Sequence, residues 1–167
     1  VKDSKLDYVL VPFSVNGFRI TSFCPSKKVS GSFTKLYLGS NVESVGENTV
    51  YLSSNFSSLR EINVDPANKF LTAYKNVLYI IGNDAPYFIP SAITKLELKP
   101  VKVIEKNFIY HLENVEEIVF AEGTERIEAY AVEKCRNLRT VYVPSSVTYM
   151  DKEAIYDCGD KVEIIRK

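Results

Sequence analysis

The sequence predicts an α/β, β-rich solenoid, in which similar turns of chain stack on one another. The main observation is a pattern that occurs twice between residues 115 and 162. Four pairs of similar residues are each 23 positions apart, namely Ile118 and Val141, Ile127 and Met150, Ala131 and Ala154, and Cys135 and Cys158. Self-similarity at a period of roughly 20 to 50 residues is typical of solenoids, whose turns bury their apolar faces only against neighbouring turns.

Composition is the second observation, and it sets the size and class of the molecule. The chain has 167 residues, 46% of them hydrophobic, so it can bury a full core without a metal or a disulfide. Lys and Arg together number 21, as do Asp and Glu, which argues against a nucleic-acid partner or an anionic membrane surface. The longest apolar runs are far shorter than the roughly 18 residues of a membrane span. We expect a single domain over residues 1–167.

Residues 1–33 are the least regular part of the chain. A strand is predicted at residues 8–12, and residues 18–23 alternate as a half-buried strand does. We predict that this segment is a degenerate turn capping the open end of the stack, because an uncovered turn exposes core and strand edges. The chain opens at Val1 without a Met or a leader, which suggests a processed start and is compatible with a removed signal peptide or a longer parent chain.

The repeats occupy residues 34–167. Each is predicted to contain a short strand with two inward residues, a turn, a further inward residue and a short helical piece. The inward pairs are Leu36/Leu38, Ile62/Val64, Leu96/Leu98, Ile118/Phe120 and Val141/Val143. Because side chains alternate along a strand, the intervening residues point outward and form columns at a strand spacing of roughly 4.8 Å. A sixth strand is predicted to begin at residues 162–165.

One repeat departs from this pattern over about residues 76–90. Two β-rich runs, 77–81 and 87–89, flank Gly82-Asn83-Asp84, and this arrangement is typical of a hairpin. We predict that the hairpin projects from one turn and forms a side wall of the outward face.

The segments 138–150 and 154–158 resemble the leucine-rich repeats of the BspA-like family, whose repeat is roughly L-x-x-I-x-I-P-x-S-V-T-x-I-G-x-x-A-F-x-x-C. Asn68-Lys69-Phe70 and Asn76-Val77-Leu78-Tyr79 are similar to the hairpin insertion of that family. The resemblance covers about residues 34–167. It implies a leucine-rich-repeat solenoid with a right-handed β/α superhelix. It also implies an exported or surface-attached protein, typically of a host-associated bacterium and often with a role in adhesion.

Residues that could perform chemistry give only weak signals. The sequence has no phosphate-binding loop, no Cys-x-x-Cys and no calcium loop, and a pair of carboxylates for a hydrolase could be chosen from the 21 acids of any chain. The single histidine, His111, is predicted to face solvent. We therefore expect no catalytic residue, no cofactor and no metal site.

The three cysteines do not form a disulfide framework. Cys135 and Cys158 lie one repeat apart, which could bring their Cα atoms within the roughly 4.4 to 6.8 Å that a disulfide tolerates. A buried column of free thiols is the favoured interpretation, because Leu112 fills the same position in the previous repeat and free Cys packs as a small hydrophobe. Cys24 is unpaired on either interpretation.

The outward columns are the best candidates for a binding site. The middle column contains Tyr37, Asn63, Glu97, Val119 and Tyr142. Exposed aromatics on a concave repeat face suit contact with protein or glycan, although the high strand propensity of Tyr also explains them. A neighbouring column alternates Lys and Glu, which predicts weak ion pairs between adjacent turns.

These observations predict a non-enzymatic binding or adhesion module, extracellular or at the cell surface. Its partner would be a host or cell-surface protein or a glycan, bound through the outward face of the parallel sheet. A structural spacer in a larger surface protein is the first alternative, and a carboxylate-based hydrolase is a less favoured one. The sequence carries no signal for an oligomeric state.

Overall fold

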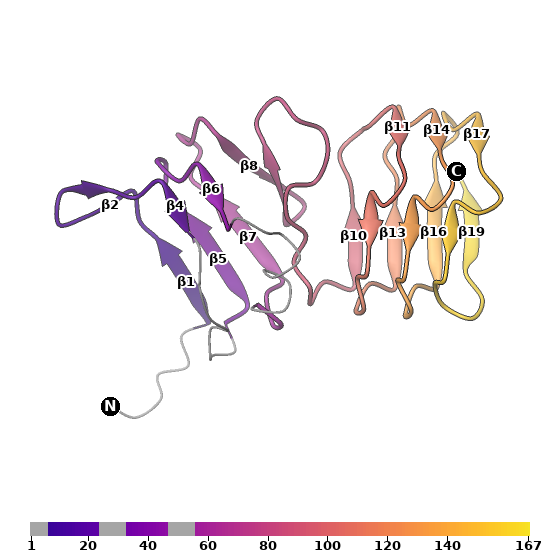
Figure 1. Cartoon of the computed structure of the whole chain (residues 1–167), viewed down its shortest axis with the longest axis horizontal. Coiled ribbons are helices and arrows are strands. Elements are labelled where there is room, and N and C mark those ends of the chain that lie inside the picture. The colour runs from indigo at the N-terminus through magenta and orange to yellow at the C-terminus, as the bar shows by residue number, and fades with distance from the viewer. Residues whose placement is uncertain (1–6, 24–32, 47–55) are drawn as a thin grey trace. The chain divides into compact units, whose positions relative to one another are not determined.

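The computed structural model describes residues 7–23, 33–46 and 56–167 (Figure 1). By its internal contacts the chain divides into two compact units, Val1–Ala92 and Ile93–Lys167. All regular elements of the described residues are strands, so the molecule is a β-solenoid. The predicted short helical pieces, and with them the α/β class, are wrong for the described part of the chain. The right-handed β/α superhelix, which requires helices, is likewise not confirmed.

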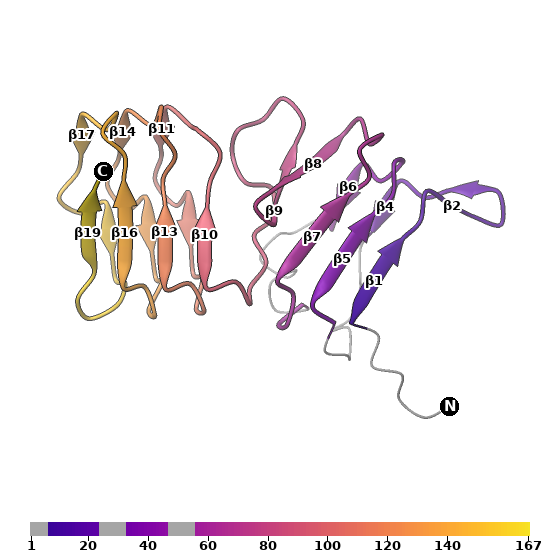
Figure 2. The ribbon, with the colours of Figure 1, turned by 180° about the vertical axis from the view of Figure 1, so that it is seen from behind.

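The second unit is built from three parallel sheets, and each complete turn gives one strand to each sheet. Figure 2 shows the strands of the first sheet standing side by side in sequence order. The first sheet contains β10 (Lys95–Glu97), β13 (Glu117–Val119), β16 (Thr140–Val143) and β19 (Glu163–Arg166). The second contains β11 (Val103–Ile104), β14 (Arg126–Ile127) and β17 (Tyr149–Met150). The third contains β12 (Ile109–Tyr110), β15 (Val132–Glu133) and β18 (Ile155–Tyr156).

The register of these sheets confirms the predicted repeat. Ile118 pairs with Val141, which in turn pairs with Ile164, and Ile127 pairs with Met150. The 23-residue offset is therefore the step from one turn to the next. The predicted inward pairs at β10, β13 and β16 are buried. The strand predicted from residue 162 is β19.

A repeated left-handed backbone position explains why the third sheet is not helical. The residues that directly follow its strands all have positive φ: His111 at 55°, Lys134 at 58° and Asp157 at 47°. A single left-handed residue interrupts a right-handed helix. The backbone bonds instead to the neighbouring turn, as where Lys134 N–H donates to the Tyr156 carbonyl oxygen at 3.2 Å. The β-branched Val132 and Ile155 also favour a strand at this position.

The first unit contains a parallel sheet of β1 (Tyr8–Val11), β5 (Lys35–Leu38) and β7 (Glu61–Val64). A second parallel pair is formed by β4 (Ser22–Phe23) and β6 (Ser44–Val45). Residues 8–11 and 22–23, predicted to belong to a degenerate cap, thus pair in parallel with the following turn. The capping role itself stays a prediction, and residues 1–6 and 24–32 of that segment lie outside the described residues.

Two hairpins extend from this unit. β2 (Ser14–Val15) and β3 (Phe18–Arg19) are joined by Asn16-Gly17, whose φ values of 50° and 79° suit a two-residue hairpin turn. β8 (Leu71–Tyr74) and β9 (Val77–Ile80) form the second hairpin, which corresponds to the insertion predicted at about residues 76–90.

The turn of the second hairpin lies earlier than predicted. Lys75 and Asn76 form it, with φ values of 49° and 68°. Pairing across Gly82-Asn83-Asp84, where the turn was expected, is limited to one antiparallel bridge between Leu78 and Phe88. A type I′ two-residue turn needs two consecutive positive φ values, and Asn is one of the few residues other than Gly that adopt that backbone.

Asn68 joins this hairpin to the preceding turn of the solenoid. The residue is 6% exposed, and its side-chain amide donates to the carbonyl oxygens of Gly39 at 2.9 Å and Val42 at 2.8 Å. Its side-chain oxygen accepts the backbone N–H groups of Phe70 and Leu71, both at 2.8 Å. Both donors and both acceptor sites of the amide are used, which explains how a polar side chain is buried here.

Candidate binding surface

The predicted outward column lies on two sheets, one in each unit. On the first sheet Tyr37 of β5 is the pairing partner of Asn63 of β7. On the second, Glu97, Val119 and Tyr142 are partners in succession on β10, β13 and β16. All five side chains are half-buried. Their stacking within each sheet is confirmed, and their role in binding stays a prediction.

Tyr37 and Asn63 line a hollow of about 320 Å³ beside β5 and β7. Leu10, Asp65 and Pro66 also line it. The sequence pattern points the two side chains outward, and the loop that follows β7 completes the hollow around them.

A second hollow, of about 540 Å³, also includes Asn63. One of its walls is the hairpin, through Thr72, Ala73, Lys75 and Asn76. The side wall was expected around Gly82-Asn83-Asp84, whereas residues 72–76 form it, because the turn lies earlier. Asn63 therefore belongs to both hollows.

The Glu61 carboxylate is held by two neighbours at the same place. The Asn63 side-chain amide donates to Glu61 Oε1 at 2.7 Å, and Lys35 Nζ lies 3.3 Å from Glu61 Oε2. The Asn63 hydrogen bond, and after it the contact with Lys35, lowers the pKa of Glu61. The hydrogen bond and charge of Glu61 raise the pKa of Lys35. The three side chains thus form a fixed, charged border, and the predicted ion pair between adjacent turns is present here.

Exposed apolar side chains extend this surface onto β1. Tyr8 meets Tyr37 edge-on, with ring centroids 5.9 Å apart. Tyr8 is 49% exposed and Leu10 is 59% exposed. Sequence reasoning missed both residues because it assigned residues 1–33 to a cap. Their spacing of two in Tyr8-Val9-Leu10-Val11 is the signal that could have placed them on the outward face.

The column of the second unit is more enclosed by charged side chains. Lys167 Nζ lies 4.1 Å from the centroid of the Tyr142 ring, a cation–π contact that covers part of the aromatic face. Lys95 Nζ lies 3.7 Å from Glu97 Oε1 on its own strand. The alternation of Lys and Glu predicted an ion pair of Lys95 with the next turn, whereas Lys95 instead pairs with Glu97 of its own strand.

A second group of tyrosines lies on the third sheet, which the sequence pattern did not single out. Tyr110 and Tyr156 are 45% and 49% exposed and lie two turns apart in the same register position. Lys134 Nζ donates to the Tyr110 hydroxyl at 2.9 Å. Tyr130 meets Tyr156 edge-on at 5.0 Å. These residues were missed because the segment was predicted to be helical, although the 46-residue spacing of Tyr110 and Tyr156 was visible.

His111 is exposed, as predicted, and its Nε2 lies 3.3 Å from Glu113 Oε1. In the part of the chain that the structure describes, no group of three His, Cys, Asp or Glu side chains could hold a metal ion. No helix long and apolar enough to cross a membrane is found among the same residues. Cys24 lies outside them.

Cys135 and Cys158 are free thiols, and Leu112 is buried at the equivalent position of the preceding turn. Cys135 is buried and Cys158 is half-buried. The hydrogen bond from the Cys135 thiol to the Cys158 sulfur lowers the pKa of Cys158. The same hydrogen bond, together with burial, raises the pKa of Cys135. The structure thus contains the predicted column of small thiols, with two unlike members.

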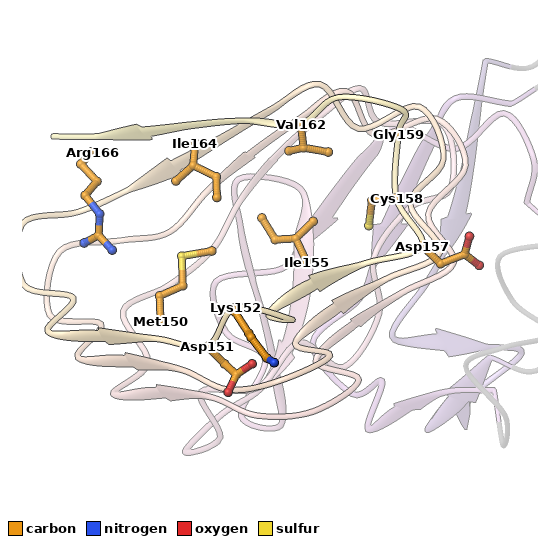
Figure 3. Close-up of a pocket in the computed structure, with 10 residues that line it drawn as sticks. All are labelled: Met150, Asp151, Lys152, Ile155, Asp157, Cys158, Gly159, Val162, Ile164 and Arg166. Atoms are coloured by element: carbon orange, nitrogen blue, oxygen red, sulfur yellow. The ribbon is translucent and has the colours of Figure 1, made fainter.

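Cys158 also lines a pocket of about 680 Å³ in the last turn. Figure 3 shows Ile164 of β19 pointing toward Met150 of β17 and Ile155 of β18. Asp151 and Arg166 lie at its border. The backbone N–H of Glu153 and then the Tyr149 hydroxyl lower the pKa of Asp151.

Stacked parallel turns with buried columns define a solenoid repeat protein. A family model described as a BspA type leucine rich repeat region, in 6 copies, matches residues 28–161. The chain belongs to this family, as the resemblance of residues 34–167 implied.

Three solved structures match the chain, and the chain spans about half the length of each. A leucine rich cell surface protein from Faecalibacterium prausnitzii A2-165 is 18% identical, with 89% of this chain and 52% of that chain covered and a TM-score of 0.39. The pneumococcal vaccine antigen PcpA is 16% identical, with coverages of 98% and 47% and a TM-score of 0.49. A leucine-rich repeat protein from Eubacterium ventriosum ATCC 27560 is 14% identical, with coverages of 87% and 52% and a TM-score of 0.43. No curated protein matches the chain significantly.

Proposed function

We propose that this chain is a non-enzymatic binding module of an extracellular or cell-surface protein and that the outward face of its sheets receives a protein or a glycan. Membership of the BspA-type family supports this proposal, because solenoids of repeats present extended surfaces. The adhesive role, the surface location and the bacterial host association that the family resemblance implies are parts of the proposal.

The observation that carries the proposal is the position of Asn63 between two hollows. The Tyr37 side of the surface offers an aromatic ring and apolar neighbours, and the hairpin side offers polar side chains. Recognition sites commonly combine an apolar lining with a few fixed polar groups. The amide of Asn63 is fixed by its hydrogen bond to Glu61. The outward sheet face of the first unit is therefore the better-formed of the two candidate surfaces.

Binding of a panel of glycans and extracellular-matrix proteins to the whole chain tests the proposal. With a ligand in hand, Tyr37→Ala and Asn63→Ala should each weaken binding about tenfold or more, since aromatic and fixed polar residues are typical centres of binding energy. Tyr110→Ala and Tyr156→Ala on the third sheet are matched controls and should bind as the wild type does. Loss of binding in the controls alone would move the site to the third sheet and contradict the proposal.

The spacer and the hydrolase make different predictions for the same experiments. A spacer retains no ligand from the panel and tolerates all four substitutions. A hydrolase needs a carboxyl group whose pKa is raised, so that it can act as a general acid. The shifted carboxylates of the described residues, Glu61 and Asp151, have lowered pKa values, which supports binding over hydrolysis.

A further inference from the structure

Cys135 and Cys158 lie at equivalent positions of two adjoining turns, two residues beyond the paired strands β15 and β18. Just before them, Lys134 N–H donates to the Tyr156 carbonyl oxygen at 3.2 Å. The two turns are therefore still paired at strand distance where they reach the cysteines.

The same two turns are also in contact just after the cysteines. Gly159 follows Cys158, and a Cβ atom at Gly159 would lie 3.2 Å from the Arg136 carbonyl oxygen and collide with that of Leu138. Close contact on both sides holds the two Cα atoms near the strand spacing of roughly 4.8 Å. That separation lies within the roughly 4.4 to 6.8 Å that a disulfide spans.

The two sulfur atoms approach the same short stretch of backbone. Cys158 Sγ lies 3.7 Å from the carbonyl oxygen of Val132, which belongs to the preceding turn. Cys135 Sγ lies 3.7 Å from the carbonyl oxygen of Glu133, the next residue. The Cys158 thiol is thus directed toward the preceding turn, where its hydrogen bond with the Cys135 thiol places the two sulfur atoms side by side.

Access to the two thiols is unequal. Cys135 is fully buried, whereas Cys158 is half-buried and lines the pocket of the last turn (Figure 3). A small reagent entering that pocket therefore meets Cys158 and not the buried Cys135.

We propose that Cys158 and Cys135 form an oxidisable dithiol site, in which Cys158 attacks a low-molecular-weight disulfide and Cys135 resolves the adduct. In the first step the Cys158 thiolate bonds to one sulfur of the reagent disulfide, the reagent S–S bond breaks, and one reagent thiolate leaves. In the second, the Cys135 sulfur attacks Cys158 Sγ and expels the second reagent thiolate, while the Cys135 proton passes to a leaving thiolate. The two protein thiols lose two electrons and the reagent disulfide gains them.

The electrostatics of the pair agree with this order of events. The thiolate is the attacking form in disulfide exchange. The Cys135 hydrogen bond lowers the pKa of Cys158, so Cys158 is the cysteine that ionises first. The product would link two neighbouring turns covalently without changing their register.

Oxidised glutathione added to the folded whole chain tests the site, with intact mass and peptide mapping as the readout. The chain and its variants should carry Cys24→Ser, so that the third thiol cannot exchange. The parent should yield a peptide in which Cys135 is linked to Cys158, and dithiothreitol should release it. Cys135→Ser should instead accumulate a glutathione adduct on Cys158, and Cys158→Ser should leave Cys135 unmodified.

Two results would overturn the site. One is a parent protein that keeps both thiols reduced under conditions that oxidise them in the denatured chain. The other is a Cys135→Ser variant without an adduct on Cys158. Because serine is polar in a buried position, Cys135→Ala provides a second trapping variant, and circular dichroism checks that each variant is folded.

Discussion

The side-chain amide of Asn68 donates a hydrogen bond to the carbonyl oxygen of Gly39, 29 residues earlier in the chain, at 2.9 Å. With the bonds of Asn68 to Val42, Phe70 and Leu71, this contact ties the β8–β9 hairpin to the turn that precedes it. The hairpin is one wall of the 540 Å³ hollow, so the shape of the proposed binding surface depends on Asn68.

Asn68→Ala should lower the free energy of unfolding by about 2 to 4 kcal/mol, because it leaves several buried donors and acceptors without a partner. Urea denaturation of both proteins measures the difference. Asn83→Ala is the matched control. Asn83 Oδ1 accepts the Ala85 N–H at 2.9 Å at an exposed site, so its loss should cost about 1 kcal/mol or less. Equal costs for the two variants would show that Asn68 does not anchor the hairpin.

Gly39 allows β1 and β5 to approach closely at their ends. A Cβ atom there would lie 2.6 Å from the Phe13 nitrogen and 2.8 Å from the Pro12 carbonyl carbon, both of which are backbone atoms. Gly39→Ala should therefore destabilise the protein by about 2 to 3 kcal/mol.

Gly82→Ala separates this steric effect from backbone strain. Gly82 has a φ of 86°, and a Cβ atom there would meet nothing within 4 Å, so only the conformational cost of about 1 kcal/mol should appear. Thermal unfolding of both variants checks that Gly39→Ala loses more stability than Gly82→Ala. A Gly39→Ala protein as stable as the wild type would exclude the close approach.

Thr124 has a buried hydroxyl without a hydrogen-bond partner among the described residues. Thr124→Val keeps the shape of the side chain and removes the polar atom, so we expect unchanged stability or a gain of about 1 kcal/mol. Chemical denaturation measures this change in the free energy of unfolding. Thr140→Val, on the outward face of β16, is the control and should change stability by less than about 0.5 kcal/mol. A loss in Thr124→Val would reveal a hydrogen bond at this hydroxyl.

The lowered pKa of Glu61 predicts a pH dependence of stability. Because the folded state binds this proton more weakly than the unfolded state, the contribution of Glu61 is present above its ordinary pKa of about 4.3 and is lost as the pH falls through the lower folded value. The contribution from the raised pKa of Lys35 is fully present below the ordinary lysine pKa of about 10.4 and is lost only as the pH rises through the higher folded value, so the two pH dependences fall in separate ranges.

Melting temperatures of the wild type and Glu61→Gln should therefore converge as the pH is lowered from about 6 to below 4. Asn63→Ala should remove part of the difference, because the Asn63 amide is the largest cause of the shift. A gap between the wild type and Glu61→Gln that is independent of pH would contradict the assignment.

Burial and register could be predicted because the sequence records them at a fixed period. Ile118, Val141 and Ile164 stack as the 23-residue offset requires. The outward residues lie between buried residues as alternation requires, except that Val64 beside Asn63 is half-buried. The third strand of each turn was not predicted, because it depends on a positive φ at a position that holds His111, Lys134 and Asp157 in successive turns, and these share no residue type that would signal it.

The hollows around Asn63 could not be predicted for a different reason. They depend on how the hairpin packs beside β7, and that packing follows from a Lys75-Asn76 turn without glycine and from the bonds of a single buried amide. The Asn16-Gly17 turn, in contrast, was a strong and available hairpin signal within a segment that was interpreted as a cap.

The three parallel pairings of the second unit have a mechanical consequence. Each complete turn there is bonded to the next complete turn through all three sheets, so a pull along the stack from its β19 side would release the turns one after another. Each detached turn would free 22 or 23 residues, or about 80 Å of extended chain. Under tension this part of the molecule would lengthen in nearly equal increments and absorb work at each one.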